Sequence, residues 1–463
     1  MKTSSIFLAM ALVFSLMMAG CGSERAAVQS ESLKTASSFS KALELQGADT
    51  TVVSALSLSD GTRIIAANTN GSNLKRSALL VKLDAQGNVL WSKKISHQGT
   101  TETTVSHARL APDGTIFLAG CVVEIVQENS LSIKTKGAIW ICQVGQNGSI
   151  IKDLVLRNAD SAVANETATD VAFAGTDVVL VGDADWDLGW QRHDRDLIAI
   201  RLDKDWQPVW SKRYGSFDYE AAVSCAISST RLYISSSVRD NSWTYFDSSL
   251  IAVDAATGEA VAGRSYSAKP ASLFANDMVV GDDGSLTLAG YCSRSGPRQA
   301  VIWKVDSNLQ TGWKSFFGYH GTDIKQIAIS SSGYVAVGYV NAEKPGNYDP
   351  IGMIAEIGSN GKPIRGAKIA IGSENAFSAL SIQDRDAFLA GNSSLDASPA
   401  YFHNLLALQG DLFKSPIATP IQFAEVSAAI TESTTVTKPS AISLSELNLA
   451  VEIVDASLEV RGL

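Results

Sequence analysis

Three aspartates at alternate positions, Asp183, Asp185 and Asp187, form the most metal-like motif in the chain. Carboxylates in such a run are hard oxygen ligands that suit Ca²⁺. A calcium loop of the EF-hand type needs glycine at its sixth position and glutamate at its twelfth. Here Gly189 falls at the seventh position, and no glutamate stands at the twelfth. The spacing therefore favours a charged, solvated loop, with calcium as the alternative, and we predict no metal ion and no cofactor.

Two cysteines, Cys121 and Cys142, are candidates for a disulfide bond. Cys121 ends one expected strand and Cys142 lies on the next, antiparallel strand, so the two side chains could face each other across the hairpin. Two buried free thiols are an equally good interpretation. The chain has no Cys-x-x-Cys motif, so neither a zinc cluster nor covalently attached haem is supported.

Aromatic residues gather in three loop segments of the middle of the chain. Exposed aromatic patches are typical of recognition surfaces. The alternative is that these rings fold back onto the strands beneath them. The candidate ligand-binding residues are Trp186, Trp190, Phe217, Tyr219, Trp243, Tyr245 and Phe246.

A repeat that runs through most of the chain must position these residues. Leu80 to Trp91 reads as strand, tight turn and strand, with Trp91 four residues after the turn glycine Gly87. This position recurs roughly every 50 to 60 residues, a spacing that fits the four short strands and loops of a propeller blade. The equivalent positions are Trp91, Lys152, Trp210, Ala262, Trp313, Arg365 and Lys414.

A second marker, interpreted as the end of an inner strand, has the same number of members: Ala67, Gly120, Gly182, Ser236, Gly290, Gly338 and Gly391. Glycine-containing turns separate β-rich segments, and no long helical periodicity follows the N-terminal segment. The sequence thus predicts an all-β chain, a seven-bladed β-propeller of four-stranded antiparallel blades. We expect large outer-strand aromatics such as Trp91 to fill the wedge between blades that splay apart with radius.

The loops of a four-stranded blade divide between two faces. The connection between the second and third strands lies on the same face as the link between blades, and the two tight turns lie on the opposite face. The long loops therefore share one face, which we call the long-loop face, and the glycine turns share the short-turn face. The candidate aromatic residues are expected on adjacent blades of the long-loop face.

Composition limits the function classes. The chain has 463 residues, of which 45% are hydrophobic and 18% charged, so it can bury a large core and is too polar for multiple membrane spans. The net charge of −9, without acidic blocks, disfavours a nucleic-acid partner. The five histidines are scattered.

The N-terminal segment has the pattern of an export signal. Lys2 supplies a positive charge, and the apolar run Ile6 to Phe14 is too short for a lasting membrane span. The run leads to Met18-Ala19-Gly20-Cys21, which resembles the lipobox of bacterial lipoproteins, with Met18 where leucine is usual. An ordinary signal peptide that ends in cysteine by chance is the alternative.

The lipoprotein resemblance implies cleavage before Cys21 and acylation (palmitate or a similar chain) of that residue. Several acyl chains would anchor the protein durably, because each buried methylene contributes about 0.8 kcal/mol. In such lipoproteins, an aspartate directly after the lipidated cysteine retains the protein at the inner membrane, and here this position is Gly22. The resemblance therefore implies an outer-membrane address, with the protein facing either the periplasm or the exterior.

These observations divide the chain into four segments. Residues 1–20 are the signal peptide, and residues 21–49 are the lipidated cysteine and a flexible tether, with possible helical turns near Ala42 to Leu45. Residues 50–418 form the propeller. Residues 419–463 are a Ser/Thr-rich tail, in which Leu447 to Val454 alternates and could form a strand.

The turns Asp254 to Gly258 and Asp84 to Trp91 resemble the repeats of quinoprotein-like bacterial propellers, which include pyrroloquinoline-quinone-type repeats. The resemblance spans roughly residues 50–418. The quinone dehydrogenases of that family use adjacent cysteines, a calcium site and a catalytic aspartate. No adjacent cysteines occur here and no residue matches the other two features, so the resemblance implies the fold and not the enzymatic activity.

Two functions from different classes remain. The first is a non-enzymatic, membrane-anchored scaffold that binds a protein or glycan through its long-loop face. The alternative is an exported hydrolase or quinone-dependent enzyme with a site in the central funnel. Its candidate groups are Asp183, Asp185, His193 and His320, although nothing in the sequence places them together.

Overall fold

The strands of this protein are seen in a computed structural model. It describes residues 38–45, 48–71, 75–128, 133–160, 163–187, 193–215, 219–239, 244–293, 297–318, 321–341, 350–371, 374–383, 386–394 and 404–412, and the backbone of short strands between residues 418 and 462. The regular elements in these ranges are β-strands. Within the same ranges, no helix is long and apolar enough to cross a membrane.

Most strands form four-stranded antiparallel meanders that run from an inner to an outer strand, and we name each blade by its inner strand. The first three blades are β2 (Asp49–Ser57), β3 (Arg63–Asn70), β4 (Arg76–Leu83) and β5 (Val89–His97); β6 (Thr100–Leu110), β7 (Ile116–Glu128), β8 (Ile133–Val144) and β9 (Ile150–Asn158); and β10 (Val163–Ala174), β11 (Asp177–Asp187), β12 (His193–Leu202) and β13 (Pro208–Tyr214).

The next three are β14 (Glu220–Ser228), β15 (Arg231–Arg239), β16 (Phe246–Asp254) and β17 (Ala260–Ser267); β18 (Ser272–Val280), β19 (Leu286–Ser293), β20 (Gln299–Val305) and β21 (Thr311–Gly318); and β22 (Thr322–Ser330), β23 (Gly333–Asn341), β24 (Pro350–Gly358) and β25 (Pro363–Ile369). The chain then forms β26 (Glu374–Gln383), β27 (Asp386–Ser394) and β28 (Asn404–Gly410).

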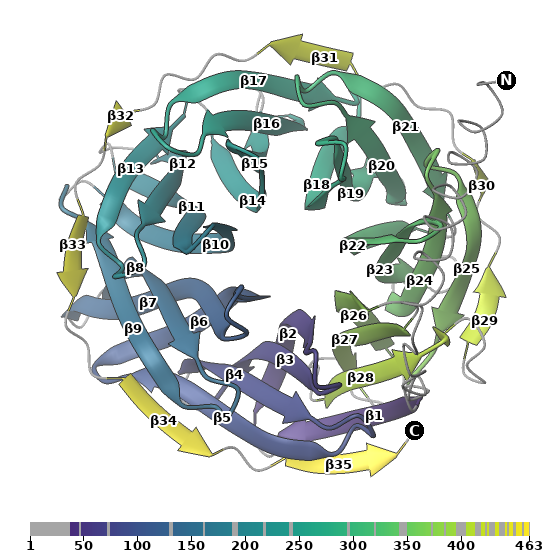
Figure 1. Cartoon of the computed structure of the whole chain (residues 1–463), viewed down its shortest axis with the longest axis horizontal. Helices are drawn as coiled ribbons and strands as arrows, with labels where there is room; N and C mark the ends of the chain where they lie inside the picture. Colours follow the sequence, from purple (N-terminus) through teal and green to yellow (C-terminus); the bar gives the residue numbers. More distant parts are fainter. Residues whose placement is uncertain are drawn as a thin grey trace, which may run out of the picture. The chain divides into compact units, whose positions relative to one another are not determined.

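The blades surround a central axis, and their inner strands contact one another in a closed ring from β2 through β26 and back to β2 (Figure 1). The hydrogen-bonded sheets number six among the described strands, five of five strands and one of ten. The ten-stranded sheet joins the β2 and β6 blades through one parallel pair, Arg76 with Glu102. The all-β propeller architecture with repeated antiparallel blades is therefore confirmed.

The β26 blade is completed by the N-terminal strand. β1 (Phe39–Leu45) pairs antiparallel with β28, with Phe39 opposite Gln409 and Glu44 opposite Asn404. The expected helical turns near Ala42 to Leu45 are therefore wrong, because Ala42 and Leu43 are buried in this strand. A strand from the opposite end of the chain thus closes the ring.

The C-terminal tail adds a fifth, outermost strand to each blade, in reverse order around the ring (Figure 1). Its strands are β29 (Ala418–Ile421), β30 (Ala424–Glu425), β31 (Thr431–Thr434), β32 (Ser440–Ala441), β33 (Leu444–Leu447), β34 (Val451–Asp455) and β35 (Leu458–Gly462). They pair in turn with β25, β21, β17, β13, β9, β5 and β1. The expected strand near Leu447 to Val454 is present as parts of β33 and β34.

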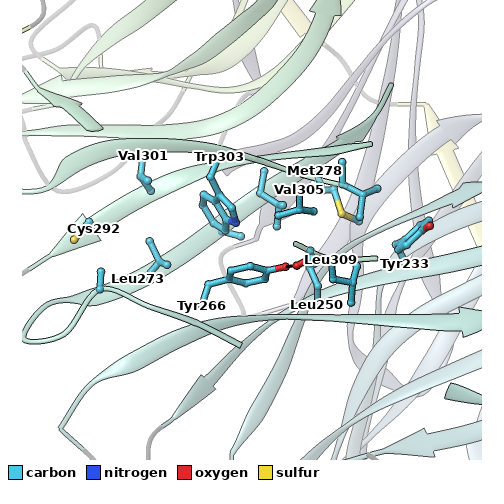
Figure 2. Packing of buried hydrophobic residues seen from close by; sticks show 14 of the residues in the cluster. Tyr233, Leu250, Tyr266, Leu273, Met278, Cys292, Val301, Trp303, Val305 and Leu309 are labelled. Carbon is cyan, nitrogen blue, oxygen red and sulfur yellow. Dashed lines mark hydrogen bonds between the residues drawn. The ribbon is translucent and has the colours of Figure 1, made fainter. Parts of the chain in front are cut away.

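Large apolar side chains fill the space between adjacent blades. Figure 2 shows one such cluster between the β14 and β18 blades, where the buried Tyr266 lies beside Trp303 and donates a hydrogen bond of 2.7 Å to the carbonyl of Leu309. Trp91 donates to the carbonyl of Gln146 on the next blade at 3.1 Å, so the wedge-filling role expected for it is confirmed.

Each inner strand carries a β-bulge at the same place. The register shifts fall between Val52 and Ser54 in the β2 blade and between Ala168 and Asp170 in the β10 blade, with equivalents in the other blades. The recurring glycines do not end a strand as expected. They lie within the second strand, opposite the residue just before the bulge, as Gly182 lies opposite Ala168.

The possible disulfide bond is not formed, and Cys121 and Cys142 are both free thiols. The register of β7 with β8 places Cys121 opposite Ile139 and Cys142 opposite Leu118. The two cysteines are thus offset by three residues along the hairpin. An odd offset directs the side chains to opposite faces of the sheet, roughly 10 Å apart along the strand.

Candidate functional site

The long-loop face of the β14 and β18 blades carries a row of three aromatic rings in contact, with a guanidinium at each end. We call it the aromatic column, and it consists of Arg239, Phe246, Phe274, Tyr291 and Arg298. All five side chains are half-buried. They lie where the second strand of a blade ends and the third begins, or where an inner strand starts.

Strand pairing produces two contacts of the column. Arg239 lies opposite Phe246, and its Cζ is 5.5 Å from the ring centroid. Phe274 lies opposite Tyr291, and these rings stack at 4.7 Å with an interplanar angle of 21°. Cross-strand neighbours on one face of an antiparallel pair are close enough for such stacking.

Contacts beyond paired residues complete the column. Phe246 and Phe274 meet between the β14 and β18 blades at 5.2 Å, and the backbone N–H of Phe246 donates to Ser272 Oγ at 3.1 Å. Arg298 lies over Tyr291, with Cζ 4.4 Å from the centroid, a cation–π geometry. The column therefore depends on two blades being held in register.

A buried carboxylate anchors one end of the column. Asp323 has a fully buried side chain and accepts hydrogen bonds from Arg298 Nη1 at 2.7 Å and from Asn276 Nδ2 at 2.8 Å. Lys325 Nζ lies 3.0 Å away, and the hydroxyl of Tyr339 donates to the same carboxylate at 3.1 Å. One buried negative charge thus holds two cations.

Arg298 and Tyr339 keep their ordinary protonation states beside this carboxylate. Burial lowers the pKa of Arg298, but Tyr339, Tyr291 and Asp323 raise it by more. Burial and the charge of Asp323 raise the pKa of Tyr339 well above its usual range. The guanidinium is therefore charged and the phenol is neutral at physiological pH.

The Asp-rich motif lies on the neighbouring β10 blade and is bound by an arginine of its own strand pair. Arg195 contacts Asp183 Oδ1 through Nη2 at 2.8 Å and Asp185 Oδ1 through Nε at 3.0 Å. Arg195 also donates to the hydroxyl of Tyr219 and lies over its ring. Burial raises the pKa of Asp183 to about 6. In the described part of the chain, no group of three His, Cys, Asp or Glu residues could hold a metal ion.

The structure places the candidate aromatic residues in different environments. Phe246 belongs to the column, and Tyr219 and Tyr245 are half-buried. Trp186 is buried beneath Arg213, whose Cζ is 4.0 Å from its ring centre, so for this residue the alternative of a ring folded back onto the strands holds. Trp190, Phe217 and Trp243, with His320 and the side chain of His193, lie outside the described residues.

Sequence reasoning missed most of the column. Phe274 and Tyr291 are ordinary alternating strand residues in the sequence, and their stacking depends on register across a hairpin. A usable signal was present at the strand ends, because Arg239 and Phe246 flank one long loop and Tyr291 and Arg298 flank another.

The central axis contains a cavity of about 510 Å³, lined by inner-strand residues. The residues after the bulges connect neighbouring blades there: Asp170 Oδ2 accepts the N–H of Cys225 at 2.8 Å, and Asp277 Oδ2 accepts that of Ile327 at 3.0 Å. Ser54 Oγ and Gln326 Oε1 accept in the same way from Ala108 and Leu380.

Asp170 and Asp277 differ in how their charges are balanced. Arg109 binds Asp170 through Nε at 3.1 Å and Nη2 at 2.8 Å, and His107 Nε2 lies 3.7 Å from it. Burial would raise the pKa of Asp170, but the charge of Arg109, with a smaller contribution from His107, holds it below its usual range. Burial raises the pKa of Asp277 to about 7. Asp277, which lines the cavity, therefore titrates near neutral pH, whereas Asp170 is held as an ion pair with Arg109.

Comparisons with known proteins give no family. No family model matches the chain, and no curated protein matches it. Solved structures with partial similarity include the polysaccharide lyase Uly1, at 13% identity over 77% of this chain and 89% of that chain, with a TM-score of 0.48. Another is the acylaminoacyl peptidase of Pyrococcus horikoshii, at 12% identity over 78% of this chain and 51% of that chain, with a TM-score of 0.43.

A third is the arabinanase Arb43A of Bacillus subtilis, at 13% identity over 51% of this chain and 91% of that chain, with a TM-score of 0.29. At such TM-scores these similarities carry no functional assignment. The assignment therefore rests on the geometry of the site.

Proposed function

We propose that this protein is a bacterial lipoprotein whose quinoprotein-like propeller is a non-enzymatic scaffold that binds a protein or glycan through its long-loop face. The aromatic column is the observation that carries the proposal. It places three half-exposed rings and two guanidinium groups side by side on one face, and aromatic and arginine side chains dominate binding hot spots.

The proposed scaffold has seven blades. The ten-stranded sheet counts as two of them, because among the described residues the strand pairing between its two meanders, β2–β5 and β6–β9, is limited to Arg76 with Glu102. Each meander also has its own inner and outer strand.

The proposed anchor is a set of acyl chains on Cys21, with an outer-membrane address. Metabolic labelling of cells with a palmitate analogue tests it. Label in the wild-type protein and none in Cys21→Ala would support the anchor. Equal labelling of the two would contradict it.

The proposed recognition face is tested by cross-linking the anchored protein in cells. We expect a specific partner with the wild-type protein and its loss in Arg239→Gln/Arg298→Gln. A matched control is Lys204→Gln, which removes an exposed cation paired with Asp205 in a tight turn on the short-turn face. Retention of the partner in the column variant, or equal loss in the control, would contradict the proposal.

An exported hydrolase or quinone-dependent enzyme with a site in the central funnel is the second candidate. The observation that favours it is Asp277, a cavity-lining carboxyl group whose pKa is raised to about 7, in the range of a general acid or base. Both of its oxygens accept backbone N–H groups, from Met278 and Ile327, which gives Asp277 a structural role. Hydrolytic turnover abolished by Asp277→Asn in a folded protein would favour this candidate.

A further inference from the structure

We propose that the aromatic column, together with Lys325, Tyr339 and Asn276, binds a glycan chain that carries carboxylate groups. This inference rests on the proposed recognition function and specifies its ligand. The first argument is the local charge. Asp323 has a fully buried side chain, whereas the side chains of Arg298 and Lys325 are 41% and 34% exposed. The exposed surface at this end of the column is therefore cationic.

The geometry of Arg298 leaves one edge of its guanidinium available. Nη1 makes the contacts with Asp323 and with the hydroxyl of Tyr339, the latter at 2.6 Å. Among the described residues, neither Nε nor Nη2 has a partner. A guanidinium edge with two parallel N–H groups matches a carboxylate in a bidentate pair, which is among the strongest hydrogen-bonded arrangements in proteins.

The column offers more than one cation. Arg239 lies at the opposite end from Arg298, with three rings between them. Each of the four successive contacts is about 5 Å. Two cationic ends separated in this way suit a ligand with repeated carboxylates, such as a polymer of uronic acid, better than a ligand with one.

The remaining groups favour a glycan over an acidic peptide. The column and its three added residues present phenol hydroxyls, a carboxamide, an ammonium group and guanidinium groups around aromatic rings, with no Ala, Val, Leu, Ile or Met among them. Planar polar groups held by buried partners suit a ligand rich in hydroxyl groups, whereas peptide recognition uses apolar pockets for side-chain anchors. Asn276 is fixed by Asp323 and by the carbonyl of Ile324, at 2.6 Å.

The net charge of the whole chain works against anions. At −9 it repels a polyanion at long range, so attraction must come from the direct contacts with Arg298, Lys325 and Arg239. Exposed charges are screened beyond about 8 Å at physiological ionic strength, which weakens that repulsion there. We therefore expect binding that is selective for carboxylates and is lost when one of these cations is neutralised.

The test measures binding of the full-length protein to polygalacturonate, to the same polymer with its carboxyl groups methyl-esterified, and to polyglutamate. We expect polygalacturonate to bind at least tenfold more tightly than the other two. Arg298→Gln and Lys325→Gln should each weaken that binding about tenfold. The control Arg365→Gln, which removes a half-exposed arginine paired with Glu356 on the β22 blade, should leave it unchanged.

Each other outcome overturns the proposal. Equal binding of the esterified polymer would show that carboxylates are not recognised. Stronger binding of polyglutamate that depends on Arg298 would show that the ligand is an acidic protein and not a glycan. The proposed recognition function would then still hold. If none of the polymers binds, the proposal of an acidic ligand is contradicted. A partner cross-linked in cells would still support the scaffold function. A thermal unfolding midpoint for Lys325→Gln equal to the wild type excludes misfolding as the cause of a loss.

Discussion

At the scale of the residue, Asp277 is a buried carboxyl group that is sensitive to pH near neutrality. It lies at the central cavity, accepts two backbone N–H groups and joins the β18 and β22 blades. Burial raises its pKa to about 7, with a smaller contribution from Asp170. Asp170 has the same structural role but is paired with Arg109, so the two equivalent positions respond to pH in opposite directions.

The raised pKa of Asp277 predicts a loss of stability as pH rises. Between about pH 4 and pH 7 the folded protein keeps this proton and the unfolded chain does not, so unfolding releases a proton and is favoured by higher pH. The effect is about 4 kcal/mol at most. We expect Asp277→Asn to flatten the dependence of the unfolding free energy on pH in this window, measured by urea denaturation. An unchanged slope would contradict the assignment.

The Arg109–Asp170 pair predicts a different result. Asp170 is fully buried, and Arg109→Met would leave its charge without its main partner. Breaking a buried pair in this way typically costs about 3–5 kcal/mol. In the double variant Arg109→Met/Asp170→Asn much of this loss should be recovered, as measured by the same denaturation. A double variant no more stable than the single one would show that the pair is not coupled.

From the sequence it was easier to predict that a residue packs between blades than to predict which residues it contacts. Trp91 was expected in the wedge between blades and bonds the next blade there. Trp186 was a candidate for an exposed aromatic patch, with folding back onto the strands as the alternative, and it is buried under Arg213. Whether such a side chain is exposed or buried depends on strand register and on contacts between blades. Neither can be read from the sequence of a single loop. The same limit explains why Phe274, Tyr291 and Arg298 were not identified.

At the scale of the element, the recurring glycines are explained by the bulges of the inner strands. A Cβ at Gly182 would lie 1.8 Å from the carbonyl oxygen of Thr167, and one at Gly120 would lie 1.9 Å from that of Thr104. Glycine allows the two backbones to approach at the bulge. Ala67 and Ser236 occupy the equivalent position in two blades. The backbone at the bulge can therefore shift to accommodate a Cβ, at some cost in stability.

Gly182→Ala is therefore expected to destabilise the protein by about 1–3 kcal/mol, the usual cost of overpacking. Gly312→Ala is a matched control, because a Cβ there would lie 3.6 Å from the carbonyl oxygen of Lys304, an ordinary van der Waals contact. Thermal unfolding of both variants is the measurement. Equal midpoints for the two alanine variants would contradict the steric explanation.

The repeat predicted the meanders but not the element that closes the ring. The fourth strand of the last blade was expected near Lys414, on the basis of the turn spacing. Instead Phe39–Leu45 supplies it, paired with residues more than 350 positions away in the chain. A seven-residue strand has no local signal of this pairing. Only the unpaired edge of β28 requires it.

At the scale of the whole molecule, the C-terminal tail covers the outer edge of every blade. Exposed strand edges are sites of intermolecular pairing, and a short outer strand blocks them. Removal of residues 418–463 should lower the thermal unfolding midpoint and promote self-association, measured by light scattering. Removal of residues 457–463 alone should expose only β1, with faster hydrogen exchange confined to β1 and β28. A full truncation that remains monomeric and as stable as the wild type would contradict this role.

The position of β1 also has a mechanical consequence. β1 is hydrogen-bonded on one side to β28 and on the other to β35. If the protein is held through Cys21, a pulling force on the N-terminal segment is applied to β1. It then acts at the same time on the hydrogen bonds of β1 with β28 and with β35. β35 would then hold β1 in place in addition to β28. The force needed to extract the N-terminus should fall when β35 is removed, even where equilibrium stability changes little.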